Sequence, residues 1–228
     1  MTALFRSITA IAAALAAASA AQAAPSFVNG LTIAASTGDQ FGTLVNDGRL
    51  GMFSDLYYDR TRNEWWGLSD RGPGGGTLSY ETRVQRFTLD VHPLTGAISN
   101  FQVAQTIKFS SSGQALNGLA PANPGVLGTS FDPEGFVINP RNGHLMVSDE
   151  YGPSVYEFDR NGSLVRSYAT PANLVPQVGG ATNHTANAAT LTSGREGNRG
   201  LEGLAISPDG RFAYTMLQNG TLADGTLT

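Results

Sequence analysis

The sequence contains no cysteine, and only 14% of its 228 residues are charged. The lack of cysteine excludes disulfide bonds, thiolate nucleophiles, cysteine-ligated zinc and iron–sulfur clusters. Lysine and arginine together number 14 against 18 acidic residues, for a formal net charge of -4, and no basic stretch is present. Nucleic-acid-binding proteins carry concentrated basic patches, so we expect no nucleic-acid partner.

Long apolar runs are also missing after residue 24, where no segment approaches the roughly 20 apolar residues that a membrane span needs. Residues 1–23 differ from the rest, because a single Arg6 precedes an uncharged, alanine-rich run. Ala21-Gln22-Ala23 forms an A-x-A cleavage pattern, which is typical of a bacterial secretory signal peptide. The alternative, a membrane-anchoring helix, lacks a basic stop-transfer segment. We therefore expect a periplasmic or secreted protein, cleaved near Ala23, whose domain covers 24–228.

Glycine is abundant, at 28 residues, and short alternating apolar segments are separated by Asn-Gly and Asp-Gly dipeptides. These dipeptides supply the positive φ angles of hairpin turns and favour antiparallel strands. No helical period of apolar residues extends beyond about ten residues. The segments that read as strands are 31–34, 83–89, 101–109, 135–138, 145–148, 154–158 and 164–168.

Three stretches repeat one pattern, in which an acidic residue is followed by a strand, a turn and a second strand. The repeat brings Leu56, Phe136 and Leu204 into alignment. The second stretch is the clearest, with four strands within 134–170, which is the size of a β-propeller blade. The sequence thus predicts an all-β fold, a β-propeller of four-stranded antiparallel blades. The alternative is a β-sandwich with accidental similarity. The blade-like units are expected at about 50–108, 131–170 and 200–228.

A propeller closes with four to eight blades, but the chain offers roughly two and a half. We therefore expect an incomplete propeller, part of a longer one, with exposed sheet edges that favour association. Insertions at 109–132 and 171–199 are rich in glycine, asparagine, serine, threonine and proline. This composition predicts surface loops, placed over one mouth of the ring.

Carboxylates recur at corresponding places, before the first strand in all three stretches and at the end of the second strand in two, where Asp70 corresponds to Asp149 with Glu150 beside it. In a propeller these places converge near the central axis, where carboxylates repel unless a cation is bound. Oxygen donors without cysteine favour Ca²⁺, then Mg²⁺ or Mn²⁺. The alternative is that the acids bind backbone N–H groups as turn or cap residues. The candidate metal ligands are Asp55, Asp70, Glu134, Asp149, Glu150 and Glu202.

Few cations accompany these acids. Arg71 follows Asp70 directly, and Arg195 and Arg199 precede Glu202. An arginine beside a carboxylate-bound cation suits a phosphate or carboxylate substrate, and the alternative is an ion pair with a nearby acid. The sequence contains no G-x-S-x-G elbow, no H-E-x-x-H motif and no G-K-[ST] phosphate loop. The three histidines are scattered, so they predict no catalytic role.

Five motifs together resemble the phytase-like domain family, called esterase-like activity of phytase. They are Ser69-Asp70-Arg71-Gly72, Phe131-Asp132-Pro133-Glu134-Gly135, Ser148-Asp149-Glu150-Tyr151-Gly152-Pro153, Asn198-Arg199-Gly200-Leu201-Glu202-Gly203-Leu204 and Ser207-Pro208-Asp209-Gly210. The resemblance covers about 27–228 and corresponds to the N-terminal part of such a domain. It implies an exported, propeller-like protein that hydrolyses phosphoesters or other esters. The R-H-G-x-R pattern of histidine acid phosphatases is absent, so such an activity would depend on a metal.

The leading hypothesis is a hydrolase that acts on a small anionic phosphate or carboxylate ester. Glu134, Glu202 and Asp149 would hold a divalent cation that polarises the ester and activates water. Arg71 and Arg199 would neutralise the charge of the substrate. A second hypothesis is a non-catalytic propeller that binds a ligand or protein and holds structural Ca²⁺. A third is a lactonase-like hydrolase of sugar acids.

Overall fold

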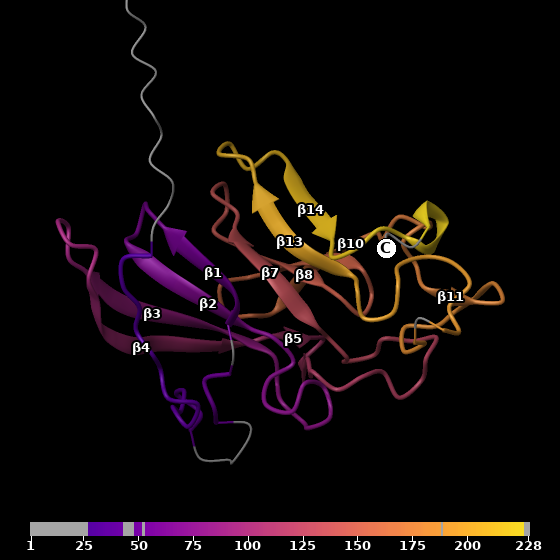
Figure 1. The fold of residues 1–228 in the computed structure, drawn as a ribbon, viewed down its shortest axis with the longest axis horizontal. Helices are drawn as coiled ribbons and strands as arrows, with labels where there is room; N and C mark the ends of the chain where they lie inside the picture. Colours follow the sequence, from indigo (N-terminus) through magenta and orange to yellow (C-terminus); the bar gives the residue numbers. More distant parts are fainter. Residues whose placement is uncertain (1–26, 43–47, 52, 188, 226–228) are drawn as a thin grey trace, which may run out of the picture.

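Two four-stranded antiparallel sheets follow one another along the chain, and a two-stranded sheet comes third (Figure 1). The computed structural model describes residues 27–42, 48–51, 53–187 and 189–225, so the expected signal peptide lies outside the described residues. The first sheet contains β1 (Phe53–Asp59), β2 (Glu64–Ser69), β3 (Arg83–Val91) and β4 (Ile98–Lys108). The second contains β7 (Pro133–Ile138), β8 (Leu145–Asp149), β9 (Ser154–Phe158) and β10 (Leu164–Tyr168). The third pairs β13 (Leu201–Ile206) with β14 (Ala213–Leu217).

Short elements complete the chain between and after these sheets. They are β5 (Ser110–Ser111), β6 (Gln114–Ala115), β11 (Gln177–Val178), β12 (Ala181–Thr182) and the 3₁₀ helix η1 (Leu222–Asp224). The predicted all-β class is confirmed, and the described residues contain no α-helix. Accordingly, none of the described segments has the helical length and hydropathy that a membrane crossing requires.

The predicted strands agree with the structure at every segment except 31–34, which forms no strand. Its side chains are largely solvent-exposed, including Leu31 at 43%. An alternating tetrapeptide is stable as a strand only when a neighbour supplies hydrogen bonds and a buried face. The described part of the chain provides neither at this segment.

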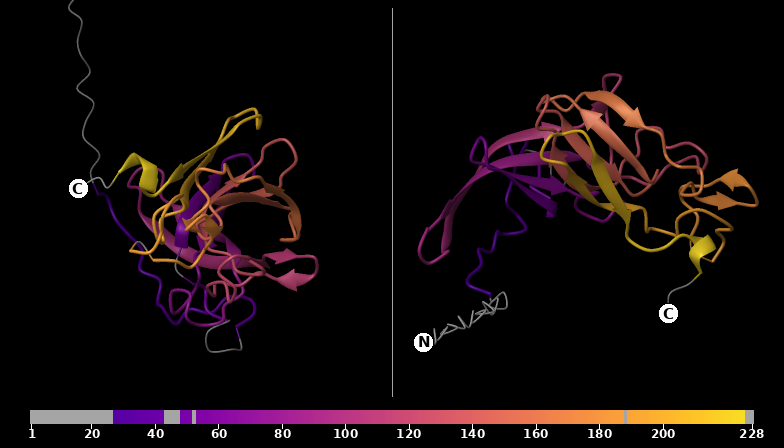
Figure 2. Two further views of the ribbon diagram at one scale, coloured as in Figure 1. Left: turned by 90° about the vertical axis from the view of Figure 1, so that its right-hand side faces the viewer. Right: turned by 90° about the horizontal axis from the view of Figure 1, so that it is seen from above.

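The first strands of the three sheets, β1, β7 and β13, lie side by side, because β7 contacts both of the others. The sheets are thereby arranged along an arch, which Figure 2 shows from two sides. Two interactions between neighbouring sheets are direct. The backbone N–H of Phe136 donates to Asp55 Oδ2 at 2.7 Å, and Ser148 Oγ donates to the Glu202 carbonyl at 2.8 Å.

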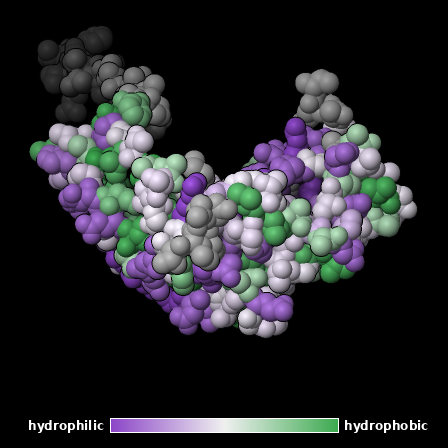
Figure 3. All heavy atoms as spheres, turned by 90° about the horizontal axis from the view of Figure 1, so that it is seen from below, coloured by the Kyte–Doolittle hydropathy of each residue, from purple (hydrophilic) through white to green (hydrophobic). Residues whose placement is uncertain are grey.

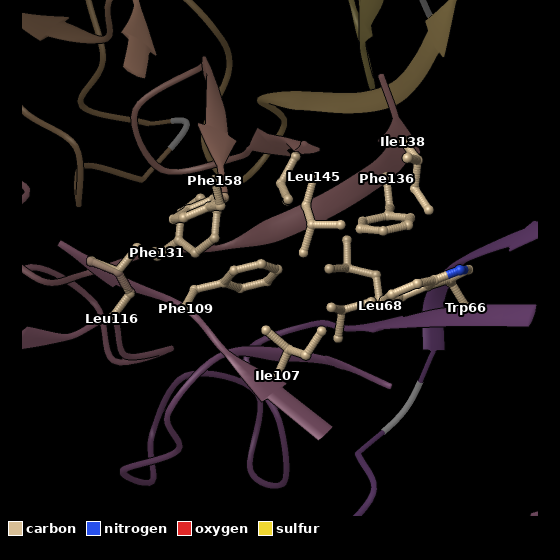
Figure 4. Packing of buried hydrophobic residues seen from close by; sticks show 12 residues of the cluster. Trp66, Leu68, Ile107, Phe109, Leu116, Phe131, Phe136, Ile138, Leu145 and Phe158 are labelled. Atoms are coloured by element: carbon tan, nitrogen blue, oxygen red, sulfur yellow. The ribbon is translucent and has the colours of Figure 1, made fainter. Parts of the chain in front are cut away.

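The hydrophobic core lies between the first and second sheets (Figure 4). Trp66 from β2 stacks on Phe136 from β7, with ring centroids 5.9 Å apart. Insertion 109–132, predicted as surface loops, contributes Phe109, Leu116 and Phe131 to this core. The reason is a set of contacts distant in the sequence, because Phe109 and Phe131 pack against Phe158 of β9, with ring centroids 4.4 and 5.8 Å away. Part of the insertion is therefore structural and not a surface loop.

The third sheet and the turn that joins its two strands carry exposed apolar side chains. Phe212, Tyr214 and Met216 are exposed at 57%, 61% and 74% respectively. Seen from below, the surface is bent around a notch between the first sheet and the C-terminal loops (Figure 3). In the second sheet, every residue of β8 is buried, whereas the edge strand β10 is largely exposed.

Gly135 lets β7 and β13 approach closely, which makes it a sensitive position. A Cβ atom built there lies 2.4 Å from the Glu202 carbonyl oxygen, too close for any side chain. We expect Gly135→Ala to push β13 away and lower the free energy of unfolding by about 1–3 kcal/mol, measured by urea denaturation. The matched control is Gly203→Ala, because Gly203 aligns with Gly135 and its Cβ would meet no atom of the described residues within 4 Å. Equal destabilisation by the two variants would contradict this close-packing explanation.

Candidate metal centre

The first strand of each sheet contains one irregularity in its pairing with the second strand, just before the aligned apolar residue. The pairing shifts between Phe53 and Asp55 in β1, between Pro133 and Phe136 in β7, and between Leu201 and Leu204 in β13. Such bulges bend a strand and redirect side chains that a regular strand would place elsewhere. The residues found at the three bulges, two positions before the aligned apolar residues, are Ser54, Glu134 and Glu202.

The ends of the second strands supply a second set of corresponding positions. The aligned residues of β1, β7 and β13 pair with Gly67, Val147 and Thr215. Three residues further along the chain lie Asp70, Glu150 and Gln218. Strand pairing therefore aligns Asp70 with Glu150, whereas the repeated Ser-Asp sequence had suggested an alignment of Asp70 with Asp149.

The two sets of positions meet as two overlapping groups of carboxylates. Asp70, Asp132 and Glu134 form one group, and Glu134, Glu150 and Glu202 form the other. Within each group, one oxygen atom per residue lies within 4.8 Å of the others, so each group has donors placed to hold a cation. Glu134 belongs to both groups, and Ser54 Oγ donates a hydrogen bond to its Oε2.

Asp132 is the member that sequence reasoning missed, although it stands in one of the quoted motifs. Its side chain is fully buried, and neither carboxylate oxygen has a hydrogen-bond partner among the described residues. Arg71 Nε lies 3.2 Å from Asp132 Oδ1 and 3.4 Å from Asp70 Oδ1. The only signal in the sequence was the position of Asp132 two residues before Glu134. Its burial gave no signal, because it depends on how insertion 109–132 packs.

Crowding of buried acids makes their charged forms costly. The pKa of Glu134 is raised to about 8, mainly by burial and also by the charges of Asp70, Glu202 and Glu150, against a lowering by the Ser54 hydrogen bond. Burial also raises the pKa of Asp132 strongly, and the nearby Arg71 offsets this only in part. The pKa of Glu202 is raised by burial and by Glu150 and Asp70. A cation would supply the positive charge that this cluster lacks.

Two predicted ligands, Asp55 and Asp149, lie outside both carboxylate groups and bind backbone amides. Asp55 accepts hydrogen bonds from the N–H groups of Leu56 and Phe136, each at 2.7 Å. Asp149 is fully buried, and burial raises its pKa to about 7 against three backbone donors that lower it. One of these donors is the N–H of Asp132, at 3.0 Å, so Asp149 helps to position the Asp132 backbone.

The two arginines predicted to contact the substrate occupy different surroundings. Arg71 is 17% exposed and lies against the cluster, and its Nη1 donates to Asn198 Oδ1 at 2.9 Å. The Arg199 side chain is 50% exposed and lies 3.7 Å from Glu196 Oε2. The structure thus brings Arg71 to the carboxylates, together with Asp70, Glu134, Glu150 and Glu202.

Comparison with protein families agrees with the motifs around this cluster. The family model described as phytase-like, esterase-like activity of phytase, matches residues 48–228. The chain belongs to this family. The match includes every carboxylate of the cluster, and it confirms the resemblance inferred from the motifs. One relative of this phytase-like chain is an uncharacterized secreted protein from Arthroderma benhamiae, 29% identical over 208 residues. The alignment covers 70% of this chain and 40% of that protein, so the phytase-like chain spans less than half of the relative's length.

Proposed function

We propose that this phytase-like chain is part of an exported hydrolase of phosphate or carboxylate esters that depends on a divalent cation. The observation that carries the proposal is the pair of carboxylate groups that share Glu134 and draw on separate sheets. Stability alone does not account for such a cluster, because it concentrates buried, mutually repelling acids around one arginine.

The residues fit a hard cation. All five side chains offer carboxylate oxygens, which suit Ca²⁺ first and Mg²⁺ or Mn²⁺ next. Both Asp132 oxygens lack a hydrogen-bond partner within the described residues, as expected of a group awaiting a cation. When bound, the cation would polarise the ester and lower the pKa of a water molecule. The proposed ligands are Asp70, Asp132, Glu134, Glu150 and Glu202.

Arg71 has the place and the chemistry to bind an anionic substrate. Its guanidinium carries donors beyond those directed at Asp132 and Asp70, and it can bind phosphate or carboxylate oxygens in a fixed fork. Arg199, half exposed, is a second proposed substrate contact. Asp149 acts in this proposal as a positioning residue, because its carboxylate binds the N–H of Asp132.

A β-propeller is the architecture that best accounts for the arrangement. The three first strands are adjacent, share the same bulge and each begin a sheet, and the two complete sheets have four antiparallel strands in sequential order. These are properties of blades around one axis. Export is supported by the secretory pattern in residues 1–23 and by the relative described as secreted.

The test is hydrolysis of chromogenic phosphate and carboxylate esters by the full chain, with Ca²⁺ or with EDTA. We expect turnover only with the cation, and a loss of about 100-fold or more in Glu134→Gln, because this variant removes a ligand common to both groups. Asp90→Asn is the matched control, since Asp90 is an exposed acid at the far end of β3. Unchanged turnover in Glu134→Gln ends the proposal. Calcium binding without turnover of any ester or sugar-acid lactone would favour the non-catalytic alternative.

A further inference from the structure

A cavity of about 390 Å³ lies beside the carboxylate cluster, on the other side of Arg71. Residues from the glycine-rich loop after β2, from the turn after β8 and from insertion 171–199 line it. The lining includes Arg71, Arg195 and His184 but no aspartate or glutamate among the described residues. Two guanidinium groups and an imidazole thus line one cavity, in a chain that is acidic as a whole.

Arg71 connects the cavity to the cluster. Its Nε faces the carboxylates of Asp132 and Asp70, at 3.2 and 3.4 Å, while its Nη1 reaches Asn198, which also lines the cavity. The loop backbone packs closely here, because a Cβ at Gly76 would lie 3.0 Å from Arg71 Cδ. A planar guanidinium with five donors can serve carboxylates along one edge and an anion along another.

Arg195 contributes a second, buried guanidinium. It is 1% exposed, and its terminal nitrogens donate to the backbone carbonyls of Glu196, Tyr151 and His184 at 2.8 to 3.1 Å. Its Nε has no hydrogen-bond partner among the described residues. A buried donor of a charged group is costly to leave unpaired, and Arg195 lines the cavity, where an oxyanion can offer an acceptor to its guanidinium.

We propose that this cavity is an oxyanion subsite, which binds a phosphate or carboxylate group separately from the proposed cation. The evidence is the pair of guanidiniums, one buried with an unpaired donor, in a lining without carboxylates. The volume exceeds that of a single phosphate and falls in the range of small-molecule pockets, about 300–1,000 Å³. The cavity therefore has room for a larger ligand that carries such a group, and inorganic phosphate is the simplest probe.

Cation and anion binding should strengthen each other. Without a cation, the clustered carboxylates repel an anion and engage Arg71. A cation that binds Asp70 and Asp132 removes this repulsion and weakens their hold on Arg71, and linkage makes the effect reciprocal. This coupling rests on the proposed function, because it needs a cation at the cluster. The subsite itself does not.

The first experiment titrates cation-free protein with inorganic phosphate in a calorimeter, with sulfate and acetate as further probes. We expect phosphate to bind the wild type, and affinity to fall about tenfold or more in Arg71→Gln and in Arg195→Gln. Arg160→Gln is the matched control, because Arg160 is exposed in the turn after β9 and does not line the cavity, and it should change affinity by less than about twofold. Circular dichroism checks that the Arg195→Gln protein folds, and the partly exposed Arg71 provides the second variant.

Phosphate that does not bind, or binds both cavity variants as tightly as the wild type, overturns the subsite. Acetate binding as tight as phosphate binding would identify a carboxylate group as the natural occupant.

The second experiment repeats the titration with Ca²⁺, using sulfate because calcium phosphate precipitates. We expect Ca²⁺ to tighten sulfate binding by about fivefold or more. Sulfate affinity that Ca²⁺ leaves unchanged, although Ca²⁺ itself binds, overturns the coupling. Phosphate binding without any Ca²⁺ binding overturns the proposed function and leaves the oxyanion subsite intact, so the two failures are distinguishable.

Discussion

Replacing Phe136 with alanine is expected to lower the free energy of unfolding by about 3–5 kcal/mol. Phe136 is 1% exposed and lies where β7 meets the first sheet. Its ring is stacked on Trp66 and meets Tyr57 edge to face, with centroids 5.9 Å apart in each pair. Removing it leaves a cavity between two sheets, which also loses the aromatic contacts. The loss is a large part of the 5–15 kcal/mol that stabilises a typical domain.

The measurement is urea denaturation followed by tryptophan fluorescence and circular dichroism. Phe212→Ala is the matched control, because Phe212 is 57% exposed on the third sheet, and it should change stability by no more than about 0.5 kcal/mol. Phe136→Leu, which preserves more of the volume, should lie between the two. If Phe136→Ala unfolds at the same urea concentration as Phe212→Ala, the two sheets do not share the core described above.

The second large effect is a loss of stability with rising pH when divalent cations are removed. The pKa of Glu134 rises from 4.5 to about 8 in the folded state, mainly through burial. The folded protein therefore favours protonated Glu134, and this contribution is complete below pH 4.5 and is lost as the pH rises through 8. The expected loss is on the order of a few kcal/mol. Glu202, whose pKa burial also raises, acts in the same direction.

A bound cation should reverse this loss, because it interacts with the deprotonated carboxylates. The increase in melting temperature on adding Ca²⁺ should thus be larger at about pH 8.5, above the raised pKa of Glu134, than at about pH 5. His184 acts in the opposite direction near pH 6.5, because burial lowers its pKa. The variant Glu134→Gln separates the contributions of Glu134 and His184. It should reduce the loss of stability with rising pH that comes from Glu134 and leave the contribution of His184 unchanged. A calcium effect of equal size at both pH values would argue against cation binding to raised-pKa carboxylates.

Repetition in the sequence predicted where the cluster would form, but not which acids would compose it. Glu134 and Glu202 were expected from the alignment of apolar residues, and both belong to the groups. Asp55 occupies the neighbouring position in the first unit, where the bulge residue is Ser54. Successive side chains of a strand point to opposite faces, so an offset of one residue decides between the cluster and a backbone amide.

The sequence also did not reveal how the two buried aspartates, Asp132 and Asp149, are hydrogen-bonded. Asp149 is fully buried with three amide donors, whereas Asp132 is fully buried with none to its side chain. Both stand in motifs with similar composition, and the difference arises from contacts made by insertion 109–132 and by Arg71. Such contacts join residues distant in the sequence, and their partners leave no local pattern.

The sequence by itself determined the all-β class, the approximate positions of most strands, the family and the chemistry available to a site. Those properties follow from local alternation, turn residues and residue type, which act over a few neighbouring positions. Only the tertiary structure decided which carboxylates meet around Glu134, that insertion 109–132 enters the core, and that Arg71 lies between an acidic cluster and a cavity that Arg195 also lines. The physical reason is that bulges, strand register and loop packing set the direction and burial of each side chain, and these depend on contacts between sheets.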